Sequence, residues 1–460
     1  MHCDCSGWRN LCIEFLWFYK RFFTSLGLFG CSGARQDTMA RTGKREDFSA
    51  DWVQGPVDVA QSTLVREVDM QEAVIVNAVR TPLGGFNGTL GNLGATKLGA
   101  LVIEEAVKRA GIAKEQVNEV IMGQVLPCGY GQNPAKQAAV QAGMPEEVEA
   151  LTINKVCGSG LKSVMLAAQA VQCGDAEVVV AGGMENMSLA PYFLKKARFG
   201  YRMGEEKIHD HMVHDGLWDH VNDFHMGISN ELCSERYQVS REDQDQYAAE
   251  SYRRTLAAQA AGKFEQEIMT VSVPQRRKDP LLFSKDECPQ ETSYEQLAKM
   301  KSAFKKDGVT TAGNASIISD GAAAVVVMSR KKAEELGCTI MASIGAQASY
   351  GIDMKYVLVA PIWAVPKCLK KEGIGKDDID LYEINEAFSG STVAALKTLE
   401  LDPAKVNVNG GSVALGHPIG ASGCRLLVTL LHELVRQDKK KGLVSLCLGG
   451  GEAVAMIVKR

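Results

Sequence analysis

The sequence predicts an α/β protein built from two copies of one unit, with a long insertion between them. Runs of β-forming apolar residues alternate with helical patterns from residue 70 to about residue 192, and the alternation resumes at residue 322. Residues 106–124 also match residues 368–386 without a gap, which indicates a duplication. Such alternation is typical of a parallel sheet with helices on its faces.

The first unit occupies residues 70–192. Its strand candidates are MQEAVIVNAVRTP, EVIMGQVL, LTINKV and AEVVVAGG. Helical periodicity separates these strands in TKLGALVIEEAVKRAG, in NPAKQAAVQAG and in the segment that follows Cys157.

The next segment, residues 193–315, is charged and irregular. It contains one helical run, SREDQDQYAAESYRRTLAAQAAG, and a basic stretch at Arg276, Arg277 and Lys278. Long loops in compact domains usually carry function, so we expect this insertion to cover a site rather than to build the core.

The second unit, residues 316–460, repeats the pattern of the first. The matched segments share the identical pairs Lys108/Lys370, Gly111/Gly373, Ile112/Ile374 and Lys114/Lys376. A looser match relates CGSGLKSVMLAAQAV to IGASGCRLLVTLLHEL. Two copies favour a closed pseudo-symmetric pair, in which equivalent helix N-termini and strand ends converge on one site.

Residues 1–69 differ from the rest of the chain. Their first part is aromatic-rich, and several acidic residues argue against a mitochondrial presequence. We expect an N-terminal extension that is either disordered or an upstream-extended translation start, with Met39 and Met70 as internal starts. A targeting role is the alternative.

Composition and charge exclude several classes of partner. The net charge of −4 and the pI near 6.1 argue against nucleic acid or an anionic membrane as the main partner. The apolar runs are too short for a membrane-spanning helix. The 13 cysteines show no disulfide framework and no CxxC pair, so we expect reduced thiols and a cytoplasmic location, with mitochondria as the alternative.

Cys157 is the first candidate for chemistry. In NKVCGSGLKS it stands near the predicted start of a helix, where the helix dipole favours a nucleophilic thiolate. Gly158 and Gly160 leave little bulk around the sulfur. A buried, inert cysteine is the alternative, so partners elsewhere must decide.

The second unit supplies such partners. His417 lies in the glycine-rich turn of GGSVALGHPIGASG, at the counterpart of the Cys157 region. Cys447 ends a buried strand before three glycines, and Asn385 follows another strand. A structural histidine and a turn asparagine are the alternatives. Two thiols, an imidazole and free backbone N–H groups suit acyl transfer better than metal ligation.

Six ordered motifs carry a resemblance to the thiolase family. They are NKVCGSGLKS, GGMENMS, TAGNAS, NEAF, GGSVALGHPIGASG and CLGGG, and the similarity runs over roughly residues 70–460. HMG at residues 225–227 and TAGNAS resemble the biosynthetic, acetyl-CoA acetyltransferase type. The resemblance implies a layered helix–sheet sandwich.

The resemblance also implies catalytic roles. Cys157 would carry the acyl group after activation by His417, and Cys447 would remove the α-proton of a second acetyl-CoA. His417 and a water held by Asn385 would form one oxyanion hole. The backbone N–H groups of Cys157 and Gly449 would form the other.

Contacts with coenzyme A follow from the same resemblance. The implied residues are Ser316 and Ala315 on the pantetheine, His225 and Met226 along the channel, and Phe304 packed against it. Ordinary core packing is the alternative for Met226 and Phe304. Gln290 replaces a family arginine, so Arg276, Arg277 or Lys278 would meet the phosphates. Ala453 stands where a glycine is usual.

We therefore expect an enzyme that condenses two acetyl-CoA to acetoacetyl-CoA and CoA, or runs the reverse reaction. A 3-ketoacyl-CoA thiolase of fatty-acid β-oxidation with broader chain length is the near alternative. The other alternative is a noncatalytic acyl-CoA or lipid carrier. Such a carrier would need none of the four residues Cys157, His417, Asn385 and Cys447. The resemblance implies a homodimer or homotetramer, CoA thioesters as substrates, and no required metal or other cofactor.

Overall fold

The computed structural model describes residues 70–460, so the extension predicted for residues 1–69 lies outside the described residues. Five strands form the first half of a mixed ten-stranded sheet. They are β1 (Ala73–Arg80), β3 (Glu119–Gly123), β4 (Glu149–Ile153), β5 (Val178–Asn186) and β12 (Ser319–Ser329). Their order is β1-β12-β5-β3-β4, and the short β2 (Gly84–Gly85) pairs with β12.

The second half of the sheet repeats this arrangement and confirms the predicted duplication. Its strands are β13 (Ala342–Gly351), β14 (Leu381–Ile384), β15 (Lys441–Leu448) and β16 (Glu452–Lys459), in the order β13-β16-β15-β14. Each half contains two antiparallel pairs followed by a parallel pair: β1/β12, β12/β5 and β5/β3 in the first, β13/β16, β16/β15 and β15/β14 in the second.

The sheet is mixed, so the expectation of a parallel sheet was wrong in part. β12 and β16 run antiparallel to both of their neighbours. β16 follows β15 after a tight glycine turn, and β12 enters from the insertion, so neither strand uses the helical crossover that parallel pairing requires. The predicted boundaries near residues 192 and 315 remain predictions.

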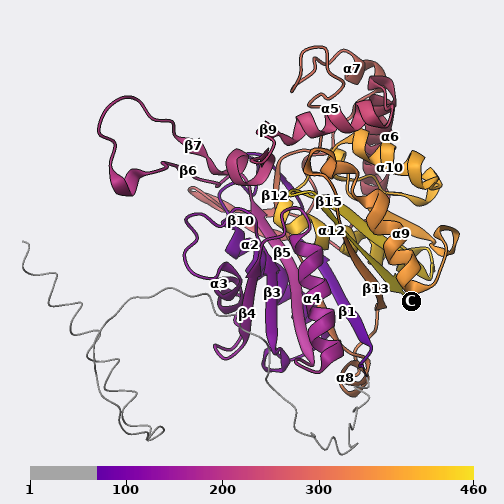
Figure 1. Ribbon diagram of the computed structural model, residues 1–460. Coiled ribbons are helices and arrows are strands. Elements are labelled where there is room, and N and C mark those ends of the chain that lie inside the picture. Colours follow the sequence, from indigo (N-terminus) through magenta and orange to yellow (C-terminus); the bar gives the residue numbers. More distant parts are fainter. Residues whose placement is uncertain (1–69) are drawn as a thin grey trace, which may run out of the picture. The chain divides into compact units, whose positions relative to one another are not determined.

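Helices cover both faces of the sheet and fill the space between its halves, as the predicted sandwich requires (Figure 1). On one side α2 (Ala95–Ala110) and α3 (Pro134–Gln141) pack on the first half. On the other side α9 (Pro361–Glu372) packs on the second half. Between them α4 (Ser159–Cys173) and α12 (Ile419–Arg436) share one buried apolar cluster with strands of both halves.

Glycines let the starts of α4 and α12 touch. A Cβ on Gly160 would lie 2.9 Å from the Cys424 backbone nitrogen, and one on Gly423 would lie 2.5 Å from the Leu161 nitrogen. A Cβ at either position would push the helices apart. Gly160, three residues after Cys157, thus lets the two halves meet at their helix N-termini.

The insertion lies mostly beside the sheet rather than within it. It contains β6 (Tyr192–Phe193) and β7 (His209–Asp210) at the base of a projecting arm, the π-helical turn η3 (Met212–Leu217), β8 (Trp218–Asp219), β9 (Phe224–His225), α5 (Met226–Arg236), α6 (Arg241–Ala260), the hairpin of β10 (Val271–Gln275) and β11 (Lys278–Phe283), and α7 (Tyr294–Ala298). Figure 1 shows the arm extending away from the sheet.

Short elements complete the chain. They are η1 (Lys114–Gln116), η2 (Ala197–Phe199), α8 (Arg330–Glu335), η4 (Met354–Val359), η5 (Lys376–Asp378), α10 (Ser389–Leu399), η6 (Pro403–Lys405) and α11 (Ser412–Leu415). Across residues 70–460, none of the helices combines the length and apolarity needed to cross a membrane.

Candidate active site

One cavity of about 260 Å³ collects side chains from both halves of the sheet and from the insertion. The sequence predicted eleven catalytic or coenzyme A-binding residues, and all of them except Asn385 and Arg276 line this cavity. The nine lining residues are Cys157, His225, Met226, Phe304, Ala315, Ser316, His417, Cys447 and Gly449. Most of the other lining residues are apolar, including Met187, Leu217, Ile318, Leu358 and Phe388. Convergence of a few polar groups in an apolar cavity is typical of a small-molecule site.

Cys157 lies on a tight turn two residues before α4 begins. The turn places Val156 at a φ of 45°, an unusual conformation for a β-branched residue. Burial raises the pKa of the Cys157 thiol to about 11, although the backbone N–H groups of Gly449 and of Cys157 itself act to lower it. The expected thiolate is therefore not the resting form, because desolvation exceeds the effect of the helix N-terminus.

His417 occupies the equivalent place two residues before α12, and it follows Gly416 at a φ of 112°. Its Nδ1 lies 2.6 Å from Ser422 Oγ, and that hydroxyl donates to the Pro418 carbonyl at 2.8 Å. The single hydroxyl proton is thus used, so His417 Nδ1–H is the donor and the lone pair of the ring is on Nε2. Burial lowers the pKa of His417 to about 3 and keeps the ring neutral.

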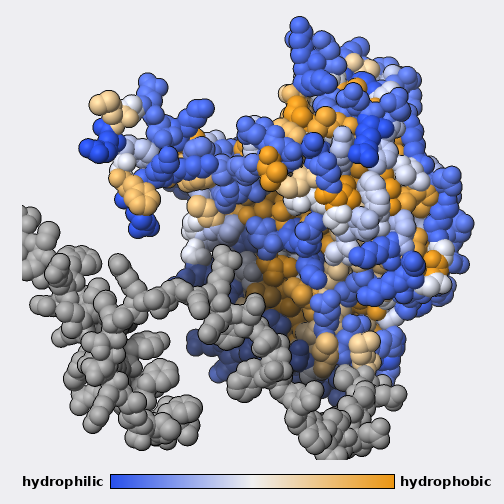
Figure 2. Space-filling model, in the orientation of Figure 1, coloured by the Kyte–Doolittle hydropathy of each residue, from blue (hydrophilic) through white to orange (hydrophobic). Residues whose placement is uncertain are grey.

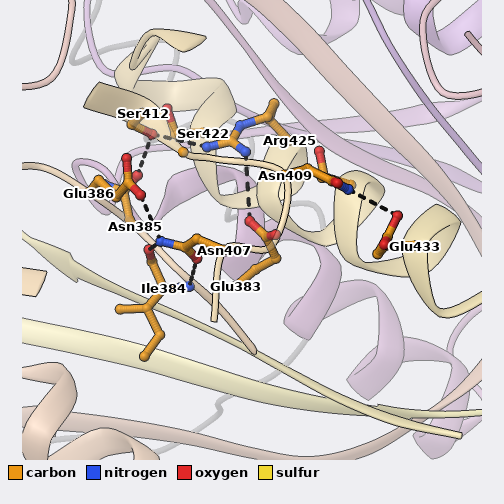
Figure 3. Close-up of polar contacts among 12 residues, drawn as sticks. Glu383, Ile384, Asn385, Glu386, Asn407, Asn409, Ser412, Ser422, Arg425 and Glu433 are labelled. Atoms are coloured by element: carbon orange, nitrogen blue, oxygen red, sulfur yellow. Dashed lines mark hydrogen bonds and ion pairs between the residues drawn. The ribbon is translucent and has the colours of Figure 1, made fainter. Parts of the chain in front are cut away.

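Asn385 lies behind His417 instead of lining the cavity. Its Nδ2 is 3.4 Å from His417 Nε2, and its Oδ1 accepts a hydrogen bond from Ser412 Oγ at 2.7 Å. Arg425 Nη2 donates to Ser412 Oγ at 3.0 Å (Figure 3). Because the Asn385 Oδ1 atom accepts the Ser412 hydroxyl, the Asn385 amide is oriented with its N–H toward His417.

Arg425 is itself fully buried, and its charge partner is Glu383 on β14. Arg425 Nη1 lies 3.9 Å from Glu383 Oε2, and both side chains are almost inaccessible to solvent. Burial raises the pKa of Glu383 well above its ordinary value and lowers that of Arg425. Removing one partner of such a buried pair destabilises the fold, because the other charge is left buried and unpaired.

Cys447 ends β15, and its thiol is buried at the cavity. Burial, reinforced by the neighbouring Cys157, raises the pKa of Cys447 well above its ordinary value. Ala453 pairs directly opposite Cys447 across β15 and β16, so the residue that departs from the family pattern is its cross-strand neighbour. Two neutral thiols and a neutral imidazole therefore face one apolar space.

The insertion closes the other side of the cavity. The His225 and Phe304 rings stack with centroids 4.8 Å apart, and His225 Nδ1 accepts the Gly227 N–H at 3.1 Å. A Cβ on Gly227 would lie 2.2 Å from Phe304, so only glycine fits there. Ser316 N–H donates to the Ala387 carbonyl at 3.1 Å, which fixes TAGNAS against the NEAF turn.

Family comparisons agree with this geometry. The family models for the N-terminal and the C-terminal domain of thiolase match residues 73–331 and 338–460. The chain belongs to the thiolase family. A relative from Pseudomonas aeruginosa, described as acetyl-CoA acetyltransferase, is 54% identical over 392 residues, which cover 85% of this chain and 100% of the relative.

Other relatives with similar descriptions match the chain over a similar length. A Cupriavidus necator protein with the same description is also 54% identical, with the same coverage. A Staphylococcus aureus protein described as a probable acetyl-CoA acyltransferase is 48% identical over 392 residues, covering 85% of this chain and 100% of the relative. The crystal structure of the Bacillus anthracis acetyl-CoA acetyltransferase aligns with a TM-score of 0.84 at 43% identity, covering 85% of this chain and 99% of that one.

Arg276 stands apart from the thiolase cavity. It lies in the turn between β10 and β11, where it is exposed, and the cavity lining does not include it. Gln290 is near the Tyr252 hydroxyl, where it acts to lower the pKa of that group, and it does not line the cavity. The structure therefore does not bring the predicted phosphate cation together with the other site residues.

Several functional neighbours escaped the sequence reading. Glu185 accepts hydrogen bonds from the N–H groups of Val125 at 2.9 Å, Leu126 at 3.2 Å and Gly420 at 2.9 Å, and burial raises its pKa to about 7. Glu185 lies within the GGMENMS motif, so the sequence did contain a pattern that could have pointed to it. For Ser422 the sequence offered only its position, one helical turn after Pro418, as an indication that it lies beside His417.

Proposed function

We propose that this thiolase is an acetyl-CoA C-acetyltransferase, which joins two acetyl-CoA into acetoacetyl-CoA and CoA and catalyses the reverse reaction. The observation that carries the proposal is the meeting of Cys157, His417 and Cys447 at one small cavity. Relatives of over 50% identity that carry this description support the same activity.

In the first half-reaction, Cys157 is the nucleophile. His417 Nε2 carries the lone pair of the ring and accepts the thiol proton as the sulfur attacks the thioester carbon of acetyl-CoA. The tetrahedral intermediate then collapses to acetyl-Cys157. The departing CoA sulfur takes up the proton of Cys447, which is left as a thiolate, while His417 keeps the proton that it took from Cys157. Proton transfer is concerted with attack because both groups rest neutral.

In the second half-reaction, Cys447 acts as the base. Its thiolate, formed when Cys447 gave its proton to the first CoA, removes a proton from the methyl group of a second acetyl-CoA. The resulting enolate carbon attacks the carbonyl of acetyl-Cys157. Acetoacetyl-CoA forms, and the Cys157 sulfur leaves as a thiolate that recovers the proton held by His417, while Cys447 is again a thiol. Thiolysis is the same sequence in reverse.

Negative charge develops at two oxygens during this cycle, so two sets of donors are needed. The N–H groups of Gly449 and Cys157 act to lower the pKa of the Cys157 thiol, and Gly449 lines the cavity beside it, so these two groups are the donors proposed for the acyl carbonyl oxygen. Protonated His417 Nε2, together with a water held by Asn385 Nδ2, would face the enolate oxygen of the second substrate.

The cavity size favours a short acyl group. Its volume of about 260 Å³ lies just below the range of about 300–1,000 Å³ that is usual for ligand pockets. Bulky apolar residues such as Met187, Leu358 and Phe388 close it. A long acyl chain would need one of these side chains to move.

One assay tests the proposal. The purified protein should consume acetoacetyl-CoA only when CoA is present, and mass spectrometry should find an acetyl group on Cys157 after incubation with acetyl-CoA. Equal turnover of a long-chain 3-ketoacyl-CoA would indicate the broader β-oxidation thiolase. Binding of acyl-CoA without turnover would indicate a carrier and overturn the proposal.

We also propose a homodimer or homotetramer in the cytoplasm, with a role in fatty-acid metabolism. The arm carries exposed apolar side chains among hydrophilic ones (Figure 2), with Phe199 87% and Met203 97% accessible. Exposed apolar side chains in such number favour burial against another copy. Light scattering on a sizing column tests the assembly, and a monomer at micromolar concentration would contradict it.

A further inference from the structure

Histidines gather in one stretch of the insertion, outside the acyl cavity. Four of the chain's eight histidines, His209, His211, His214 and His220, lie between residues 209 and 220. Asp215 stands among them. A short histidine-rich tract of this kind is a composition typical of metal binding.

The fold turns this sequence cluster into a cluster in space. Donor atoms of His214, Asp215 and His220 all lie within 4.8 Å of one another. The His214 and His220 rings are 4.3 Å apart between centroids. Zinc binds nitrogen and oxygen ligands at about 2.0–2.2 Å. His220 Nε2 lies 2.7 Å from the His214 carbonyl oxygen in the unliganded fold. Rotations of the exposed Asp215 and His220 side chains that exchange their present contacts would place all three donors on one ion.

His214 provides an observation that its packing does not explain. Its Nε2 atom is buried without a hydrogen-bond partner among the residues from 70 onward. Its Nδ1 lies 2.5 Å from Asp215 Oδ1. A buried polar atom without a partner is unfavourable, so a ligand that engaged this ring would relieve a cost of the unliganded fold.

A second layer of residues already orients these donors. His211 Nδ1 lies 2.7 Å from Asp215 Oδ2, and His211 Nε2 accepts the Cys128 N–H at 3.4 Å. The Phe193 ring packs against His209 and His214, with centroids 5.5 and 5.2 Å away. Carboxylates and imidazoles that bind metals are commonly held by such outer contacts.

We propose that His214, Asp215 and His220 form a binding site for a divalent transition-metal ion such as Zn²⁺. Two imidazoles and one carboxylate match the ligand preference of such ions, with water completing the coordination. His214 and Asp215 belong to η3, whose next two residues, Gly216 and Leu217, line the acyl cavity. The ion would thus fix one wall of that cavity without taking part in the chemistry.

The test is a Zn²⁺ titration of the full chain by calorimetry, after removal of metals with a chelator. The cavity thiols could bind zinc themselves, so they are first blocked with iodoacetamide. We expect one equivalent per chain, and a rise in melting temperature with zinc concentration because the ion binds the folded state. His220→Asn and His214→Gln should each weaken binding by about 100-fold or more.

A matched control separates the site from general surface charge. Glu206→Gln removes a nearby exposed carboxylate on the arm and should leave zinc affinity unchanged. Circular dichroism checks that each variant is folded. Absence of a stoichiometric site in the alkylated protein would overturn the proposal, as would variants that bind zinc as tightly as the parent. Co²⁺ absorption bands of thiolate type that disappear on alkylation would assign the metal to the cysteines instead.

Discussion

The two halves of the molecule place their reactive groups in the same way and anchor them differently. Cys157 stands two residues before α4, and His417 stands two residues before α12. The residue before each has a positive φ, 45° at Val156 and 112° at Gly416. A duplicated turn thus presents a thiol from one half and an imidazole from the other.

The surroundings of these two turns have diverged. Side chains hold His417 from both ring nitrogens, through Ser422 on one side and Asn385 on the other. At Cys157 the groups that act to stabilise a thiolate are backbone N–H groups, from Gly449 and from Cys157 itself. The turn common to both halves sets the position of each reactive group, and the residues around it, which differ between the halves, set its chemistry.

The largest expected effect comes from removing the thiol of the first half. Cys157→Ser should lower kcat for acetoacetyl-CoA thiolysis by at least about 1,000-fold, because a hydroxyl is a far weaker nucleophile than a thiol beside the same base. Cys173→Ser changes an exposed thiol at the other end of α4 and should leave kcat unchanged. Similar losses in both variants would show that the effect comes from the helix and not from the nucleophile.

The next effect tests whether contact between the two helices holds the halves in register. Gly160→Ala puts a methyl group 2.9 Å from the Cys424 nitrogen, which should reduce the free energy of unfolding by about 1–3 kcal/mol and lower kcat. Denaturant unfolding and steady-state kinetics measure both quantities. In the control, Gly375→Ala, the new methyl group meets only Asp378 Oδ2 at 3.6 Å. Unchanged stability in Gly160→Ala would contradict close packing of the two helices.

A smaller effect should come from the hydrogen-bond chain that exists only in the second half. Ser412→Ala breaks the link between Arg425 and the Asn385 amide, and we expect kcat to fall about tenfold, equivalent to one buried hydrogen bond, while KM changes little. Ser391→Ala removes another buried hydroxyl of this half, which bonds to the Phe388 carbonyl. An equal loss in both variants would mean that Ser412 contributes stability and does not orient Asn385.

The pH dependence of stability should also differ between the two reactive groups. The His417 pKa falls from an ordinary 6.5 to about 3, so the unfolded chain binds more protons between these values and stability falls as pH drops. His417→Gln should reduce that slope by up to about 1.4 kcal/mol per pH unit below pH 6. The Cys157 pKa is raised to about 11, so Cys157→Ser should leave the slope unchanged. Equal slopes for His417→Gln and the parent would show that His417 is protonated in the folded chain.

The sequence predicted the parts of this picture that depend on local pattern. Periodicity located the helices and strands, and the match of residues 106–124 to 368–386 anticipated the repeated strand order. Glycine-rich motifs pointed to Cys157 and His417. These signals are short-range, so one chain is enough to read them.

What the sequence could not predict depends on long-range packing. The pairing of β12 with β1 and β5 joins segments more than 100 residues apart. The chain from Arg425 through Ser412 to Asn385 crosses three separate elements. The rise in the Cys157 pKa reflects burial by many neighbours at once. The outward position of Arg276 is set by a hairpin that its basic stretch does not encode.

The smallest expected effect tests the strained turn itself. Val156→Gly would give the first half the residue type that the second half uses at Gly416, and it would relieve a φ of 45° that disfavours valine. The variant also loses apolar contacts, since Val156 packs in two buried clusters beside Cys157. The relieved strain is about 1–3 kcal/mol, and the lost burial is about half of the 1.5–3 kcal/mol of a fully buried valine, because Val156 is only partly buried. The two effects oppose each other. We therefore expect the free energy of unfolding to change by less than about 1 kcal/mol. A much larger loss of stability, measured by denaturant unfolding, would show that the first half needs the valine side chain where the second half needs only a flexible backbone.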